Sequence, residues 1–162
     1  MLRLPIMKTG LLALGALLLA LFSGCAGAPK VPPTLQYFAP QPGRSTATVT
    51  GSEVPSPLTH NQTAFVVSVD GKVVMLGKKG WNLPLLVEAG PRIIDVQMSR
   101  GDFVSQSYLE LNAVPGGHYI LKFDSDVGLL GNNTYCDFWF ADAATGSPVT
   151  PKQRGSIQGG GR

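Results

Sequence analysis

The chain has 162 residues, of which 44% are hydrophobic and only 14% are charged, and it contains 20 glycines and 13 prolines. This length suits one domain with appendages, and the abundance of glycine and proline favours short strands joined by tight turns over long helices. The formal net charge of +3 is not gathered into the clustered basic face of a nucleic-acid-binding protein, so we expect no nucleic-acid partner.

Residues 1–24 are typical of a bacterial secretory signal peptide. Arg3 and Lys8 form a short basic start, and an apolar run from Leu11 to Phe22 follows it. A basic start, a short apolar segment and small residues before a cleavage site are the three parts of such a signal. The apolar run is shorter than the roughly 20 residues needed to cross a bilayer comfortably. We therefore expect this segment to be removed during export.

The end of this segment carries a lipidation motif. Residues 21–25, Leu-Phe-Ser-Gly-Cys, resemble the lipobox of bacterial lipoproteins, although Phe22 stands where leucine is usual. The resemblance implies that Cys25 is lipidated and becomes the N-terminal residue, and two acyl chains already anchor a protein stably. Because Ala26 follows the cysteine, the resemblance also implies sorting to the outer membrane, and we expect the periplasmic face. The alternative is a core helix with a chance cysteine.

Two segments of biased composition flank the expected domain. Residues 25–45 combine the lipidated cysteine with a Pro-rich linker, and such stretches behave as extended, semi-rigid spacers. Tyr37 and Phe38 interrupt this composition, and we expect them to dock on the domain. Residues 151–162 are Gly-rich and polar, which predicts a disordered tail. Residues 46–150 form the expected β-sandwich domain.

The clearest turn in this domain is Asp70-Gly71, which lies between two apolar runs. Such a dipeptide is a strong indication of a two-residue hairpin with a type I′ turn. The turn predicts three facing pairs: Val69 with Lys72, Val67 with Val74, and Phe65 with Leu76. One face of this hairpin is then apolar except near the turn.

Period-two alternation continues along the rest of the domain. Apolar residues alternate in five stretches separated by Gly- or Pro-containing turns: Leu83 to Val87, Ile94 to Met98, Leu109 to Leu111, Tyr119 to Phe123 and Cys136 to Phe140. Short strands with one apolar face indicate two sheets packed against each other. We predict an all-β fold, a single antiparallel β-sandwich of the immunoglobulin- or transthyretin-like kind.

An ordered series of turn and strand residues resembles the PEGA-type modules and small β-sandwich outer-membrane lipoproteins of unknown function from proteobacteria. The series comprises Val-Asp-Gly-Lys at residues 69–72, the stretch 88–96, and the stretch 109–123 with its double-glycine turn. The Pro-Glu-Gly-Ala tetrapeptide itself is absent, and Pro91-Arg92 replaces the usual Gly-x-His. The similarity covers residues 64–124, and it implies an exported binding or scaffolding module with no catalytic residues to carry over.

We expect neither a metal site nor a cofactor. His60 and His118 belong to no cluster with zinc-ligand spacing, so we expect exposed turn histidines. Residues 124–126, Asp-Ser-Asp, begin like a calcium loop. However, Gly128 and Tyr135 stand where an EF-hand needs oxygen ligands. A polar strand exit is the better interpretation.

We also expect no enzyme, because no catalytic set is recognisable. The chain has no Gly-x-Ser-x-Gly elbow, and Cys136 has no identifiable base. With Cys25 lipidated, Cys136 has no partner in the chain, and we expect a buried, inert thiol; intermolecular pairing or reaction is the alternative. A hydrolase with an unrecognised site is the weakest hypothesis, which a pocket holding two close carboxylates would support.

Three aromatic residues are the candidate contacts to a ligand or partner. If Cys136 and Phe138 face the core, Tyr135 and Trp139 face outward, while Trp81 lies in a loop. Exposed aromatic residues with polar neighbours suit a protein interface or sugar stacking. The leading hypothesis is a scaffold or interaction lipoprotein that binds another envelope protein, and the alternative is a glycan or peptidoglycan binder. The linker or the tail could instead cover these side chains.

Overall fold

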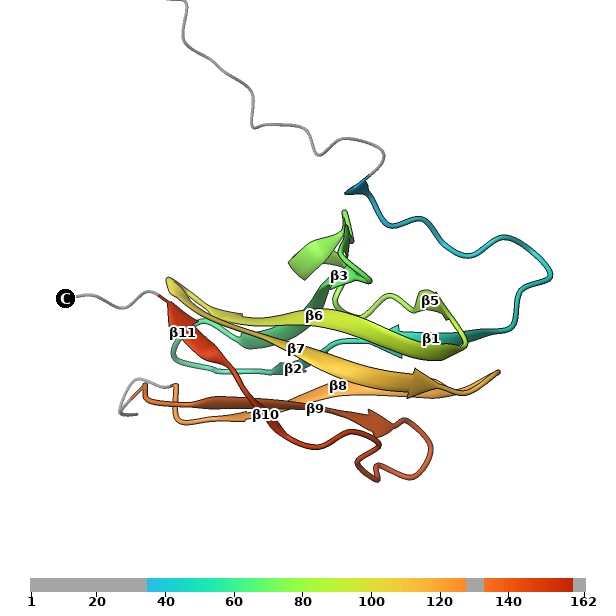
Figure 1. Ribbon diagram of the computed structural model, residues 1–162. Helices are drawn as coiled ribbons and strands as arrows, with labels where there is room; N and C mark the ends of the chain where they lie inside the picture. The colour runs from blue at the N-terminus through green and yellow to red at the C-terminus, as the bar shows by residue number, and fades with distance from the viewer. Residues whose placement is uncertain (1–34, 128–132, 159–162) are drawn as a thin grey trace, which may run out of the picture. The chain divides into compact units, whose positions relative to one another are not determined.

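The structure of this chain, a computed structural model, describes residues 35–127 and 133–158 (Figure 1). The predicted signal peptide and Cys25 lie outside the described residues. Within the described part, the chain forms β-strands and a single turn of 3₁₀-helix, η3 (Gly77–Gly80). It contains no helix that is long and apolar enough to cross a membrane.

The strands form two sheets that Figure 1 shows stacked face to face. The five-stranded sheet has the order β10 (Gln153–Arg154), β9 (Cys136–Asp142), β8 (His118–Ser125), β1 (Thr46–Thr50), β5 (Leu85–Glu88). The six-stranded sheet has the order β11 (Ser156–Gln158), β7 (Phe103–Ala113), β6 (Gly90–Arg100), β3 (Gln62–Val69), β2 (Ser52–Val54), and β4 (Lys72–Val73) pairs with β3. The strands pair antiparallel except β1 and β8, which run parallel. The predicted all-β sandwich is confirmed.

The core lies between the sheets, and on β6 and β9 it is formed by the strand faces that the alternation predicts. On β3 the prediction fails, because a register shift between Val66 and Ser68 places Ala64, Val66 and Val69 in the core cluster and leaves out Phe65 and Val67. Ile94, Val96 and Met98 on β6 are at most 1% exposed. Phe138 and Phe140 on β9 are 0% exposed and belong to the same cluster. Because side chains alternate between the two faces of a strand, the residues between these positions point outward.

The predicted hairpin forms, but it is shorter than expected. Asp70 and Gly71 have φ values of 49° and 75°, as a type I′ turn requires at both central positions. Val69 faces Lys72, and β4 ends one residue later. The predicted pairing of Phe65 with Leu76 is wrong, because the chain turns away into η3 at this point. The strand expected from Leu83 likewise begins only at Leu85.

The expected disordered tail at 151–162 is wrong for residues 153–158, which form β10 and β11. β10 pairs with β9, and β11 pairs with β7, so this segment passes from the edge of one sheet to the edge of the other. Ile157 packs against the core. Gly155 permits the crossing, because a Cβ there would overlap Ser105 Oγ and come within 2.7 Å of Phe138 Cε2.

The second half of the expected linker is also part of the folded domain. We call residues 35–45 the strap. The Tyr37 N–H donates a 2.8 Å hydrogen bond to the Val73 carbonyl, and Gln36 forms a parallel bridge with Val73. Docking is therefore confirmed for Tyr37, whereas the Phe38 side chain is 66% exposed.

Candidate functional site

Two of the three predicted contact residues lie at β9: Trp139 is on the outer face of the strand, and Tyr135 directly precedes it. Their alternate neighbours Phe138 and Phe140 are fully buried, so the strand faces the way the sequence predicts. Both rings are half-buried, and Asp137 lies between them in the strand.

Two cations of the C-terminal segment lie over these rings. Lys152 Nζ is 4.4 Å from the centroid of the Trp139 ring, and the Arg154 guanidinium carbon is 5.0 Å from that of Tyr135. Both distances suit cation–π interactions. Arg154 also forms an ion pair with Asp137, in which Nη2 lies 3.2 Å from Oδ2. The C-terminal residues thus cover part of the aromatic surface, as one alternative anticipated.

We call Tyr135, Asp137, Trp139, Lys152 and Arg154 the β9 face. The charge of Asp124, followed by burial and the charges of other nearby carboxylates, raises the pKa of Tyr135. The hydrogen bond to Asp137 raises the pKa of Arg154. At neutral pH the Tyr135 phenol and the Arg154 guanidinium therefore keep their protons, and both can donate hydrogen bonds.

Trp81 lies elsewhere, in the connection between η3 and β5. Its carbonyl accepts a 2.6 Å hydrogen bond from the Gly51 N–H, and its side chain helps to line a small hollow with Phe65 and Leu76. In the sheet order, β8 and β1 separate β5 from β9. At about 4.8 Å per strand, three strand spacings are too far for Trp81 to share one stacking surface with Trp139.

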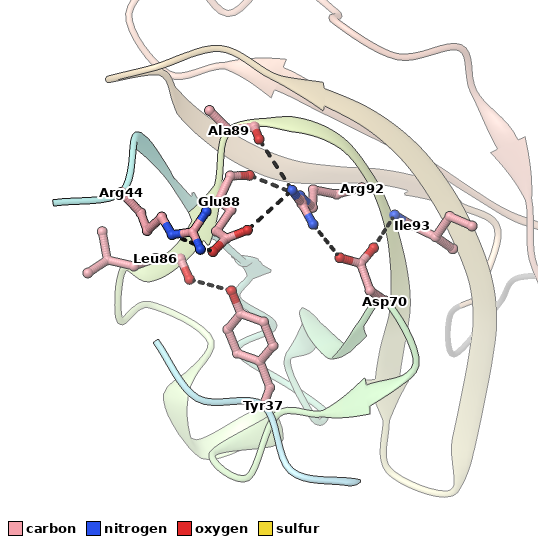
Figure 2. A network of polar contacts seen from close by, with 8 residues as sticks. All are labelled: Tyr37, Arg44, Asp70, Leu86, Glu88, Ala89, Arg92 and Ile93. Atoms are coloured by element: carbon pink, nitrogen blue, oxygen red, sulfur yellow. Dashed lines mark hydrogen bonds and ion pairs between the residues drawn. The ribbon is translucent and has the colours of Figure 1, made fainter. Parts of the chain in front are cut away.

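A second polar cluster surrounds Arg92 at the start of β6 (Figure 2). Arg92 Nη1 donates a 2.8 Å hydrogen bond to Asp70 Oδ2, and Nε donates one of 3.1 Å to the Glu88 carbonyl. Nη2 donates to the Ala89 carbonyl and lies 3.6 Å from Glu88 Oε2. Asp70 in turn accepts a 3.0 Å hydrogen bond from the Ile93 N–H. One guanidinium therefore holds the hairpin turn against the end of β5.

The strap lies beside this cluster, and Figure 2 shows both together. The Tyr37 hydroxyl donates a 2.8 Å hydrogen bond to the Leu86 carbonyl, and burial raises the pKa of Tyr37. Arg44 Nε lies 4.0 Å from Glu88 Oε1. Tyr37, Phe38, Asp70, Glu88 and Arg92 are among the residues that line a hollow of about 140 Å³. This hollow holds two carboxylates, Asp70 and Glu88, but both are paired with Arg92.

The expected polar strand exit is found at Asp126. Its carboxylate accepts hydrogen bonds from the Thr134 N–H at 2.7 Å, the Thr134 hydroxyl at 2.6 Å and the Tyr135 N–H at 2.9 Å. The carboxylate therefore joins the two sides of the connection between β8 and β9. In the described part of the chain, no three His, Cys, Asp or Glu side chains gather as metal ligands would. His60 and His118 are exposed, as expected, but His118 is the first residue of β8 and does not lie in a turn.

Cys136 is a buried thiol within the core. Its side chain is 0% exposed, and burial raises its pKa to about 12. Because the thiolate is the reactive form, this environment makes the side chain a poor nucleophile. The expectation of an inert core cysteine fits this geometry.

Sequence reasoning missed Lys152, Arg154 and Gly155, because the composition of residues 151–162 indicated disorder. The available signal was the polar–apolar–polar pattern of Ser156, Ile157 and Gln158, which matches a short strand with one buried side chain. It also missed Arg92, whose five donors suit a site where several acceptors converge. No local pattern identifies those acceptors, because they come from a turn and a separate strand.

Comparison with known proteins adds no relative: no family model, no curated protein and no solved structure matches this chain. The resemblance to PEGA-type lipoproteins therefore stays a prediction.

Proposed function

We propose that this chain is a lipid-anchored envelope protein whose β-sandwich is a non-enzymatic interaction module, with the β9 face as its contact to another envelope protein. The observation that carries the proposal is the pairing of Tyr135 and Trp139 with Arg154 and Lys152 on one outer face. Tyrosine, tryptophan and arginine are the residue types that dominate binding energy at protein interfaces.

The anchor in this proposal is Cys25 in its lipobox-like context. We place the lipidated protein at the periplasmic face of the outer membrane, because alanine follows the cysteine. A tether of this kind concentrates the domain at a membrane surface, where even a modest interface can select a partner.

The two carboxylates of the hollow beside the strap, Asp70 and Glu88, are engaged in ion pairs with Arg92, which supports a non-enzymatic role. A general acid in glycoside cleavage needs a raised pKa. Burial raises the pKa of Asp70, but hydrogen bonds from Arg92 and the Ile93 N–H, with the Arg92 charge, outweigh it and lower the pKa overall. The pKa of Asp70 is therefore shifted in the opposite direction to that of a catalytic proton donor.

Crosslinking in intact cells tests the proposal. The lipidated chain is crosslinked in the bacterium that produces it, and adducts are compared for the native chain, Trp139→Ala and Tyr135→Ala. Tyr108→Ala is the matched control, because Tyr108 is 54% exposed on β7 in the other sheet. Loss of an interface hot spot costs about 2 kcal/mol or more, so we expect binding to fall about 30-fold in the β9 variants alone.

Two results would contradict the proposal. A partner whose capture is unchanged in the Trp139→Ala and Tyr135→Ala chains does not use the β9 face. A Cys25→Ala chain that still fractionates with the membrane and captures the same partner does not depend on a lipid anchor.

The second candidate is a glycan or peptidoglycan binder that uses the same face. It is favoured by the residues opposite β9: Lys122 faces Trp139 and Asp124 faces Asp137, so hydrogen-bonding groups flank an aromatic ring as sugar recognition requires. Sedimentation with purified cell walls separates the two candidates. Loss of sedimentation in Trp139→Ala, with Tyr108→Ala unaffected, would favour the glycan.

A further inference from the structure

A surface beside the strap gathers exposed apolar side chains. Half of the large hydrophobic residues that are exposed in the described part of the chain lie on the strap or between β4 and the middle of β5. They are Leu35, Phe38, Met75, Leu76, Leu83 and Leu86. The Gln36 bridge to Val73 and the Tyr37 hydrogen bond to Leu86 bring these segments side by side. Figure 1 shows the start of the strap and η3 on the same side of the domain. We call this surface the strap face.

Three exposed lysines lie among these apolar residues. Lys72 is in β4, and Lys78 and Lys79 are in η3. None of them forms an ion pair with a described residue. Apart from Lys72, whose charge helps to lower the pKa of Asp70, these lysines have no acidic partner in the described residues, unlike Arg92 and Arg154, which form ion pairs within the domain.

The strap face also lies where the proposed anchor enters the domain. Leu35 is about ten residues after Cys25. An extended chain spans at most about 3.3–3.6 Å per residue, so any conformation of the tether keeps Leu35 within about 35 Å of the lipidated residue. Because the strap, residues 35–45, belongs to the domain, the spacer between the lipid and the domain is about half as long as the linker predicted for residues 25–45.

We infer that the strap face lies against the bilayer that holds the anchor, with its apolar side chains in the headgroup region and its lysines on anionic phospholipid headgroups. This inference rests on the proposed lipid anchor. Surfaces that combine apolar side chains with lysine bind the membrane interface in this way. β5 lies at one edge of its sheet, and β9 and β10 form the other edge. Docking through the strap face therefore leaves the β9 face free for a partner.

The two tryptophans of the chain report on this orientation. Trp81 follows directly after the lysines of η3, and Trp139 lies on the β9 face. The lipidated protein is purified in detergent and reconstituted into vesicles of phosphatidylcholine and phosphatidylglycerol that contain acyl-brominated lipid. Trp139→Phe leaves Trp81 as the reporter, and Trp81→Phe leaves Trp139. Apolar side chains of an interfacial surface reach about 5–10 Å into the membrane, so we expect about a two-fold loss of Trp81 fluorescence and little change for Trp139.

Matched variants test the surface itself. In the Trp139→Phe chain, Phe38→Glu should restore most of the Trp81 fluorescence, because the charge cannot enter the headgroup region. Val149→Glu changes an exposed apolar residue beside β9, 44% exposed, and should leave the quenching unchanged. Replacing phosphatidylglycerol by phosphatidylcholine should weaken the quenching through the lysines.

The outcomes distinguish this inference from the function on which it rests. Protein that floats with the vesicles but shows equal quenching of both tryptophans would overturn the strap face and leave the anchor intact. Protein that does not float would overturn the anchor and the inference together. Shielding of Trp81 that rises with protein concentration in the absence of lipid would assign the surface to a second copy of this chain and overturn the inference as well.

Discussion

The two edges of the five-stranded sheet are closed by opposite ends of the described chain, and by different forces. At the β5 edge, the strap is held by directional polar contacts, chiefly the Tyr37 hydroxyl on the Leu86 carbonyl and the Arg92 cluster beside it. At the β10 edge, the C-terminal segment is held by close backbone packing at Gly155 and by cations over aromatic rings.

This difference shows how an exposed sheet edge can be protected in two ways. An uncovered edge strand presents unpaired N–H and C=O groups that invite association with other chains. On β9 these groups are paired directly with a short added strand, β10. At β5 a side chain and a charged cluster cover the edge without adding a strand. The first solution depends on steric fit, and the second depends on charge.

The largest expected effect is at the steric edge. Gly155→Val places a side chain against Ser105 Oγ and Phe138 Cε2, and overpacking of this kind costs about 3 kcal/mol. We expect this clash to push the C-terminal segment away from β9, which breaks the hydrogen bond from the Gly155 N–H to the Cys136 carbonyl. Urea unfolding measures the loss of stability, and the rate of Cys136 thiol labelling measures the opening.

Ser156→Ala is the matched control, since Ser156 is the exposed neighbour in the same segment. It should change neither quantity appreciably. A Gly155→Val chain with native stability and native protection of Cys136 would show that the segment is held mainly by its side chains.

An intermediate effect separates the two arginines. Arg92 has a side chain that is 23% exposed and serves the hairpin turn and β5, whereas the Arg154 side chain is 62% exposed. Arg92→Ala leaves charged and carbonyl acceptors without their donor, which costs about 2 kcal/mol. Arg154→Ala removes an exposed ion pair and should destabilise the fold much less than Arg92→Ala. Urea unfolding of both variants measures their free energies of unfolding. An equal loss of stability in the two variants would contradict the claim that the two edges are held by different forces.

The smallest effect is a pH dependence confined to the charged edge. Burial raises the pKa of Asp70, but the hydrogen bonds from Arg92 and the Ile93 N–H lower it by more than burial raises it. The pKa of Asp70 in the folded protein therefore lies below its value in the unfolded chain. The contribution of Asp70 to stability is therefore fully present above its ordinary pKa and is lost as the pH falls through the folded pKa. Urea midpoints measured from neutral to acidic pH should fall less steeply at the acidic end in Asp70→Asn. Arg92→Ala should move the same step to higher pH, and an unchanged profile in both variants would contradict this assignment.

The contrast between the edges also bears on function. On the β9 face the cations are engaged with aromatic rings and Asp137, so the proposed partner would meet a preformed set of side chains. Preorganised side chains lose less conformational entropy on binding. The lysines of the strap face have no such partners among the described residues, which suits the diffuse charge of a lipid surface better than a shaped protein interface.

By itself, the sequence determined the local features of this protein: the buried faces of β6 and β9, the type I′ turn at Asp70-Gly71 and the all-β class. These depend on period-two alternation and on the φ values that particular residues tolerate, and both are properties of neighbouring residues.

Only the tertiary structure decided the parallel pairing of β1 with β8, the place at which the strap docks and the covering of Trp139 by Lys152. Tyr37 and Leu86 are 49 residues apart, and Arg154 and Asp137 are 17 apart. Such contacts follow from where the folded sheets place distant segments. Composition alone therefore predicted a flexible tail at Gly155, where close packing requires a glycine.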